Sequence, residues 1–461
     1  MTRISLNRQN LGEDVTLTLT DIANGGYAVG HQEDGRTVFA RFGLPGETVR
    51  VALKAVRNKL AYGDVVRVHE HPHPARVEPA WEDAGPEGVG AAELSHVRFD
   101  AQAMWKGYVL AQSLVRMGSR QLAEHVASVA QTDGLLEGLD TTVDSAPLHV
   151  HQSERDTAKR GWHSRTRAEF VIDDAGRPAM THSFSHELHP LTSLPIIADD
   201  AERLDVFSPS WRQVWQPGDR VRVVMPSGDE PRVVINRNQV LSLAGRPVRQ
   251  DVAEEVILSS QQFHYGVGAS DFWQLHREAP SRLIIDMCRA LAAAEGIAPV
   301  REEMDALRTA SEILAGMDVI ELYAGSGLFS QPLAQAIGPN GRLRTWEGSR
   351  SAVAHARANL REFPWAHVSH ASIDARFLHG LHADIVVADP PRSGLGTRAA
   401  RALASVAGRV LVIAFCDIAA CARDLQVLHE AGWQVRSFVA EDLFPNTPHA
   451  EIVVSLTKGD A

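Results

Sequence analysis

Hydrophobic and polar residues alternate in short runs along the first part of the chain. Apolar residues occupy every second position in Val15–Leu19, Thr37–Phe42 and Val49–Leu53, and turn residues such as Gly25-Gly26 and Pro45-Gly46 separate these runs. A period of two is typical of strands that bury one face. The pattern therefore predicts a small β-barrel over residues 1–70.

The pattern changes after the barrel. Histidine, proline and glycine are frequent from residue 69 to 90 and indicate a polar linker, which we favour over a metal site at His69, His71 and His73. Apolar spacing predicts a helix over Phe99–Gly118, and β-like alternation returns over Leu148–Val223. We expect residues 71–262 to form this linker and a central, β-rich domain.

From Asp271 onward helical and strand patterns alternate. A helix is predicted over Leu275–Glu295, followed by buried strands at Met317–Tyr323, Arg342–Trp346, Asp384–Ala388 and Arg409–Phe415. This alternation is typical of a doubly wound parallel sheet. The predicted fold class is a multidomain α+β and α/β protein, in which residues 263–461 form a Rossmann-like domain.

Composition limits the functional classes. The 461 residues are 44% hydrophobic and 22% charged, which is typical of a globular protein, and the net charge of −11 disfavours non-specific attraction to nucleic acid or anionic lipid. Basic residues nevertheless cluster between Arg50 and Arg67 and between Arg155 and Arg167, where they could contact phosphates. No apolar run approaches the roughly 18 residues of a membrane span, and Met1–Asn10 lacks the apolar core of a signal peptide. We therefore expect a cytoplasmic protein with no membrane association.

The three cysteines, Cys288, Cys416 and Cys421, are an odd number and are widely spaced. This arrangement favours neither a disulfide framework nor a cysteine-based metal cage, and no metal site is expected. Any chemical role of a cysteine here belongs to a free thiol.

A glycine-containing turn follows the first predicted strand of the C-terminal domain. Gly325 and Gly327 precede a predicted helix, Gln331–Ile337, so that backbone and helix N-terminus can approach a ligand. The second strand ends in Glu347, about 20 residues further on, where an acid can bind a ribose diol. Because no third glycine follows for a pyrophosphate, S-adenosylmethionine is favoured over NAD.

Three chemically competent groups are predicted at the same sheet edge. Asp389-Pro-Pro-Arg392 and Cys416 each follow a predicted strand, and Glu451 begins another. A thiolate that attacks C6 of a pyrimidine makes C5 nucleophilic enough to accept a methyl group, and a carboxylate can then remove the C5 proton. The residues alone leave open a proline-rich loop, an inert buried cysteine and a solvated acid.

Together these motifs resemble the RNA 5-methyluridine methyltransferase family, whose members use S-adenosylmethionine to methylate a uridine in transfer or ribosomal RNA. The segments Gly25–Val29, Asp34–Phe39 and Leu44–Glu47 are similar to its TRAM domain, an OB-like RNA-binding module. Gly161–Arg167 resembles the start of its central β domain. The resemblance extends over nearly the whole chain.

The resemblance implies a role for each site residue. Cys416 would be the nucleophile and Glu451, within His449-Ala-Glu451, the base. Asp389 and Arg392 would bind the substrate. The implied cofactor-binding residues are Gln274 of the Phe272-Trp273-Gln274 element, Tyr323, Gly325, Gly327, Glu347 and Asp389.

The chain also departs from the family pattern. Asp417, Ile418 and Ala420 replace the residues that usually follow the nucleophile, and an acid next to the thiol should raise its pKa if it lies close. Many relatives hold an iron–sulfur cluster with four cysteines, whereas residues 76–96 contain none here, so no cluster is expected. We expect Trp81 and the segment Gly88–Leu94 to pack conventionally instead.

Three functions are compatible with these features. The first is methylation of uridine C5 in RNA, with ribosomal RNA favoured over transfer RNA because of the TRAM-like domain. The second is cytosine-C5 methylation of RNA, although Pro391 is followed by Arg392 where that class has a second thiol. The third is an inactive RNA-binding paralogue. None of them implies an obligate protein partner.

Overall fold

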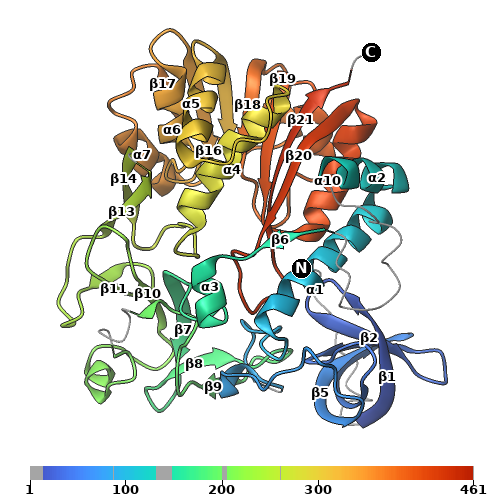
Figure 1. The fold of residues 1–461 in the computed structure, drawn as a ribbon. Coiled ribbons are helices and arrows are strands. Elements are labelled where there is room, and N and C mark those ends of the chain that lie inside the picture. Colours follow the sequence, from blue (N-terminus) through green and yellow to red (C-terminus); the bar gives the residue numbers. More distant parts are fainter. Residues whose placement is uncertain (1–13, 87, 131–147, 200–204, 260, 460–461) are drawn as a thin grey trace.

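The computed structural model describes residues 14–86, 88–130, 148–199, 205–259 and 261–459. Figure 1 shows three parts: a barrel at the N-terminus, a β-rich middle and a larger α/β domain. None of the helices in these ranges is long and apolar enough to cross a membrane.

The N-terminal part is a closed barrel. Its strands follow the order β1-β2-β3-β5-β4, and their bounds are β1 (Asp14–Ala23), β2 (Tyr27–His31), β3 (Thr37–Arg41), β4 (Thr48–Arg57) and β5 (Leu60–Glu70). Small apolar residues such as Ala28, Val38 and Ala61 are fully buried inside it. Gly63 permits closure, because a Cβ there would lie 2.3 Å from the Ala52 carbonyl oxygen. The predicted barrel is confirmed.

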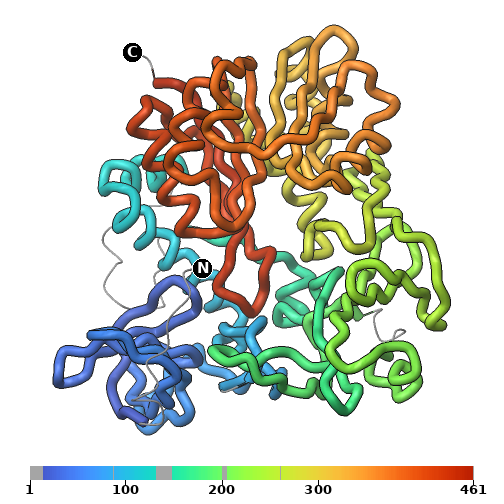
Figure 2. The backbone as a smooth tube through the Cα atoms, turned by 180° about the vertical axis from the view of Figure 1, so that it is seen from behind, coloured from blue at the N-terminus to red at the C-terminus, as the bar shows by residue number. Residues whose placement is uncertain are grey.

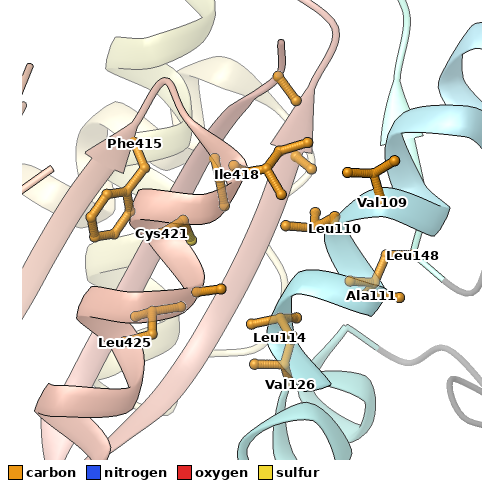
Figure 3. Close-up of a cluster of buried hydrophobic side chains, with 14 of the residues drawn as sticks. Val109, Leu110, Ala111, Leu114, Val126, Leu148, Phe415, Ile418, Cys421 and Leu425 are labelled. Atoms are coloured by element: carbon orange, nitrogen blue, oxygen red, sulfur yellow. The ribbon is translucent and has the colours of Figure 1, made fainter. Parts of the chain in front are cut away.

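The segment after the barrel crosses to the C-terminal domain. It contains the short η2 (Glu82–Ala84), α1 (Phe99–Ser113), the π-helical turn η3 (Leu114–Gly118), α2 (Arg120–Val129) and β6 (Val150–His151). Figure 3 shows Leu110 and Leu114 facing Ile418 and Leu425 of α10 (Ile418–Glu430) in a shared apolar cluster. Strand β6 pairs in parallel with β20 (Trp433–Glu441).

This placement differs from the sequence interpretation in two ways. The predicted division assigned residues 71–262 to the linker and central domain, whereas the apolar side chains of residues 99–130 and 148–151 pack against the C-terminal domain. The predicted helix Phe99–Gly118 remains α-helical only to Ser113 and then widens into the π turn.

The middle part is built around a six-stranded sheet. Its order is β12-β11-β10-β7-β8-β9, and its bounds are β7 (Arg167–Ile172), β8 (Pro178–Thr181), β9 (Leu188–Pro190), β10 (Arg220–Val224), β11 (Arg232–Ile235) and β12 (Gln239–Leu241). The helices α3 (Glu154–Lys159) and η5 (Pro209–Gln213) flank it, and the hairpin β13 (Asp251–Leu258) and β14 (Gln261–Gly268) leads onward. Trp81 is buried in the same apolar cluster as Val89 and Phe170, so the cysteine-free segment packs conventionally as predicted.

The C-terminal domain is an eight-stranded sheet of order β17-β16-β15-β18-β19-β21-β20-β6. The remaining strand bounds are β15 (Asp318–Leu322), β16 (Arg342–Glu347), β17 (Ala366–His370), β18 (Ala383–Ala388), β19 (Ala407–Phe415) and β21 (Glu451–Lys458). The helices are α4 (Ala279–Ala294), α5 (Glu303–Leu314), α6 (Ser330–Ile337), α7 (Arg350–Asn359), α8 (Ala375–Leu378), α9 (Thr397–Leu403) and α10. Strands β15 to β19 are parallel and β21 is antiparallel to β19.

Alternate residues of the central strands enter two separate cores. Ile320 and Leu411 belong to the cluster that includes α1 and α10, whereas Val319 and Val412 belong to the cluster that includes α4 and α6. Both faces of the sheet are therefore covered, as in a doubly wound fold. The chain order reverses between β15 and β18, and ligands of such sheets bind beyond the carboxyl ends of the strands at that point.

Candidate active site

A cavity of about 680 Å³ opens at this reversal point. The sequence-predicted site residues that line it are Gln274, Tyr323, Gly325, Glu347, Asp389, Arg392, Cys416 and Glu451. They come from the ends of five strands and from the loop after β14. Gly327 does not line the cavity, but its N–H closes the glycine turn onto the Ala324 carbonyl oxygen at 2.9 Å.

The glycine turn has a left-handed backbone where it faces the cavity. Gly325 has a φ of 55° and Gly327 a φ of 98°, and a Cβ at Gly325 would meet no atom within 4 Å. Tyr323 has a φ of 64° although it is not a glycine, so its conformation is strained. Strain of this kind is concentrated at ligand sites, and the open space beside Gly325 allows a ligand to approach the backbone.

Glu347 is held in place by backbone donors. Its Oε2 accepts from the Gly325 N–H at 3.0 Å, and its Oε1 accepts from the Ser349 N–H at 2.6 Å. The acid predicted to bind a ribose therefore also holds the glycine turn against the second strand.

The loop that carries Gln274 is anchored to both neighbouring domains. Thr166 of the central part donates its hydroxyl to the Gln274 carbonyl oxygen at 3.1 Å. On the other side, Asp271 accepts from Ser351 at 2.7 Å and lies 3.1 Å from His355 of α7. Hydrogen bonding to Asp271 raises the pKa of His355 to about 9, so this pair is ionised at neutral pH.

The loop after Asp389 is shaped by α10. Gly394 has a φ of 67°, and a Cβ there would lie 2.4 Å from an Asp424 carboxylate oxygen. The same oxygen accepts from the Leu395 N–H at 2.7 Å, and Arg423 donates to the Ser393 carbonyl oxygen at 2.7 Å. These contacts fix the turn that presents Arg392 to the cavity.

Cys416 lies directly after β19 and is half-buried, whereas Cys288 and Cys421 are buried. Asp417 is the N-cap of α10 and accepts from the Ala420 N–H at 2.8 Å. The departure at Asp417 is therefore compatible with a well-formed helix start. Burial raises the pKa of the Cys416 thiol to about 12, and the negative charges of Glu451, Asp389 and, more weakly, Asp417 act in the same direction.

Two carboxyl groups share the cavity with this thiol. Burial raises the pKa of Asp389 to about 7, and Glu347 adds to the increase. Glu451, the first residue of β21, is 3% exposed, and burial together with Asp389 raises its pKa well above the usual range, while Arg392 opposes the change. Burial in this cavity therefore disfavours the ionised forms of all three acidic groups.

The loop before Glu451 is fastened by α1. Lys106 forms a fully buried ion pair with Asp442 and donates to the Phe444 carbonyl oxygen at 3.1 Å. Gln102 exchanges two hydrogen bonds with Asn446, each of 2.9 Å. Sequence reasoning missed both α1 residues, because their partners lie more than 300 positions away.

Sequence reasoning also missed a buried acid and a third wall of the cavity. Glu321 of β15 is 1% exposed, accepts from the Ser330 hydroxyl, and has a pKa raised to about 7 by burial. Ala371, Ser372 and Ile373 line the cavity directly after β17, a strand that the apolar pattern did not reveal. In the parts of the chain described, no three potential metal ligands come together.

Comparison with known proteins places the chain in a family. The TRAM domain model matches residues 8–66. An RNA methyltransferase of Bifidobacterium longum, itself functionally uncharacterized, is 31% identical over 95% of this chain and 95% of its own length. The chain belongs to this family of RNA methyltransferases.

Other relatives carry more specific names. The 23S rRNA (uracil(1939)-C(5))-methyltransferase RlmD of Psychrobacter arcticus is 24% identical over 94% of this methyltransferase and 86% of its own length. The solved Pyrococcus abyssi tRNA (uracil-54, C5)-methyltransferase in complex with S-adenosyl-L-homocysteine has a TM-score of 0.63 and 17% identity, covering 96% of this chain and 99% of that chain. At that identity the likeness shows a common fold, which agrees with the family recognised from the motifs.

Proposed function

We propose that this methyltransferase transfers a methyl group from S-adenosyl-L-methionine to C5 of a uridine in RNA. The observation that carries the proposal is the meeting of Cys416, Glu451 and Asp389 in one cavity with the glycine turn. The names of its relatives support the substrate class, because they include uracil-C5 methyltransferases that act on RNA.

The chain's own residues fit the cofactor. The open backbone at Gly325 and the carboxylate of Glu347 suit an adenosine, and Gln274 lines the same cavity. When bound, S-adenosylmethionine supplies an electrophilic methyl group and a positive charge. A positive charge in the cavity favours ionisation of the nearby carboxyls, which reverses the effect of burial on their pKa values.

Cys416 acts as the nucleophile in this proposal. Its Sγ, as a thiolate, bonds to C6 of the uracil, and the C5–C6 electron pair moves toward the C4 carbonyl to give an enolate. The enolate carbon C5 would then bond to the methyl group, and the electron pair of the broken S–CH3 bond would remain on the sulfur of S-adenosylhomocysteine. Because the pKa of the thiol is raised to about 12, the thiol must give its proton to solvent before Sγ bonds to C6.

Glu451 completes the reaction as a base. Its carboxylate removes the remaining C5 proton, the C5–C6 double bond forms again, and the thiolate leaves C6. We propose that Asp389 and Arg392, which line the same cavity, hydrogen-bond the uracil and the cofactor. Arg392 also offsets the negative charge that would otherwise oppose formation of the thiolate.

We propose ribosomal RNA as the substrate in preference to transfer RNA. The TRAM domain and the RlmD relatives named for 23S rRNA favour this choice. The RNA-binding surface, like the roles of the individual site residues, remains part of the proposal.

The test is to incubate the purified protein with labelled S-adenosylmethionine and unmodified 23S rRNA or tRNA transcripts, and to identify the methylated nucleoside by mass spectrometry. We expect 5-methyluridine, predominantly in the ribosomal transcript. Formation of 5-methylcytidine, or of no methylated nucleoside by the folded protein, would contradict the proposal. Predominant methylation of the tRNA would overturn only the choice of RNA.

The covalent step has its own control. Cys416→Ala should abolish methylation while leaving cofactor affinity within about twofold of the wild type, because the thiol acts on the base. Cys288→Ala, which removes a buried thiol in α4, should retain activity. Retained methylation by Cys416→Ala would rule out the adduct.

A further inference from the structure

Three aromatic side chains stand together on the outside of the barrel. Phe39 and Tyr62 are stacked with ring centroids 5.1 Å apart and an interplanar angle of 15°. Tyr27 packs edge-on against both rings, at 6.1 Å from Phe39 and 5.8 Å from Tyr62. The three residues come from the neighbouring strands β2, β3 and β5, and each is half-buried.

The three rings lie on the outer face of the barrel, whereas smaller apolar residues fill its core. Within β3, Val38 and Ala40 are fully buried while Phe39 between them faces outward. The same alternation puts Ala28 and Ala61 inside the barrel, next to Tyr27 and Tyr62 on the outer face. Cross-strand aromatic pairs stabilise a sheet, but three partly exposed rings on one face also form a surface on which a flat ligand can stack.

This aromatic face lies close to the loop that precedes Glu451. Tyr27 follows the Gly25-Gly26 turn, and a Cβ at Gly26 would lie 3.2 Å from Glu93 and 3.6 Å from Pro448. Figure 2 shows the red loop after β20 descending from the methyltransferase sheet between the other two parts of the molecule. A strand of RNA with its target base in the cavity therefore has the barrel face within reach.

The central domain extends the same face. Next to the rings, Arg41 pairs with Asp64 in a buried ion pair of 2.7 Å. The ring of Phe184, from the turn between β8 and β9, lies 4.8 Å from the Arg41 guanidinium. The buried ion pair holds β3 to β5 and so fixes the strands from which Phe39 and Tyr62 project.

Charge favours RNA as the occupant of this face. Arg57, the last residue of β4, and Lys59, in the turn before β5, are both exposed. These cations are available to phosphates although the whole chain has a net charge of −11. Aromatic rings flanked by basic residues are the arrangement that single-stranded nucleic acids require, because bases stack while phosphates pair with cations.

We propose that Tyr27, Phe39 and Tyr62 form a stacking platform for unpaired bases that neighbour the target uridine. This inference rests on the proposed function, since it takes RNA to be the substrate. It assigns to the barrel a specific contact by which the flanking nucleotides are held while the target base occupies the cavity.

The test replaces rings without removing apolar bulk. Phe39→Leu and Tyr62→Leu should each weaken binding of a single-stranded oligouridylate of about 12 nucleotides by about fivefold or more. Phe39→Tyr, which keeps the ring, should restore wild-type affinity. The matched control is Phe363→Leu, which breaks a comparable pair with Trp365, 5.7 Å apart, in the methyltransferase domain and should leave RNA affinity unchanged.

Cofactor affinity and thermal unfolding are measured on the same variants. Weaker RNA binding by folded leucine variants that bind S-adenosylmethionine normally supports the platform. Unchanged RNA affinity overturns the proposal. The aromatic face would then serve to bind a protein partner or only to stabilise the barrel.

If the leucine variants unfold, ultraviolet crosslinking of the wild-type protein to the same RNA decides. Crosslinks at Tyr27, Phe39 or Tyr62 support the proposal, and crosslinks confined to other peptides overturn it. Nucleoside analysis of the wild-type product reports separately on the proposed function, so failure of either proposal can be distinguished.

Discussion

At the scale of single residues, the cavity combines a thiol with two carboxyls that are all more difficult to ionise than in water. Burial is the largest cause for Cys416, Asp389 and Glu451, and the three negative charges oppose one another. Burial of this kind disfavours the accumulation of negative charge in the cavity. In the proposed reaction, the positive charge of the cofactor and the binding of the substrate would favour ionisation of these groups.

The first prediction concerns pH. Because the raised pKa values belong to groups that must ionise, kcat/KM should increase with pH from about 6 to about 9, reflecting the free enzyme. Because the pKa of Asp389 is raised to about 7, its ionisation should contribute to the increase in kcat/KM near neutral pH. Initial rates at subsaturating RNA, with folding checked at each pH, measure the profile. A profile that is flat or falls over this range would contradict the electrostatic description.

A second prediction isolates the thiol. Asp389→Asn removes a negative charge that raises the pKa of Cys416, so the pKa of the thiol should fall and alkylation by iodoacetamide should become faster at a fixed pH near 8. Each unit by which the pKa falls increases the thiolate fraction about tenfold in this range. Mass spectrometry of the Cys416 peptide measures the rate, with buried Cys288 as an internal control. An unchanged rate would mean that Asp389 does not influence the thiol.

At the scale of elements, the loop that carries Glu451 depends on a helix far away in sequence. Lys106 and Asp442 are both fully buried, and Gln152 donates to the second Asp442 oxygen at 3.0 Å. Removal of one partner leaves a buried charge without its counterion, which typically costs about 3–5 kcal/mol. The pair thus makes α1 part of the catalytic domain.

The third prediction follows from this pair. Lys106→Met should lower the free energy of unfolding by about 3–5 kcal/mol, and denaturant titration measures the loss. The matched control is Lys106→Met combined with Asp442→Leu, which removes both charges and should be less destabilised than the single variant. If the double variant lost the sum of the two single effects, the two side chains would be energetically independent.

The central strands of the C-terminal sheet could be predicted from the sequence. Apolar runs identified β15, β18 and β19 to within about two residues, because these central parallel strands are buried on both faces. The predicted β16 also agrees with the structure, although its sequence alternates and only Leu343 and Thr345 are buried in it. The positions of Asp389 and Cys416 followed from the predicted strands, since parallel strands end at a common edge.

Other elements carried no such signal. Strand β17 is a half-exposed edge strand that contains two histidines, and β6 has only two residues. Their positions depend on partners elsewhere in the chain, as does the position of Lys106, whose partner is 336 residues away. A local pattern cannot indicate such a partner, so the α1 contribution to the site could not be predicted.

At the scale of the whole molecule, the methyltransferase domain is discontinuous. Its sheet ends in β6, and its α10 packs against α1 and η3, so these elements complete a domain whose next helix, α4, begins only at Ala279. Figure 3 shows Ile418 pointing toward this segment, and Phe415, Cys421 and Leu425 belong to the same apolar cluster. The strand that presents Cys416 thus depends on chain that precedes the central domain.

The last prediction tests this dependence. A truncated chain that begins at residue 263 should be poorly soluble and bind the hydrophobic dye ANS, because it exposes the α10 face that α1 covers. A chain that begins at residue 71 loses only the barrel, whose five strands close on themselves. It should still show a cooperative thermal transition. The transition temperature should be lower than in the full chain, because Tyr108 loses its 3.0 Å hydrogen bond to Asp21. Cooperative unfolding and S-adenosylmethionine binding by the chain that begins at residue 263 would contradict this prediction. They would mean that residues 99–151 are dispensable for the fold. The contacts of α1 would then hold the Glu451 loop without completing the core of the domain.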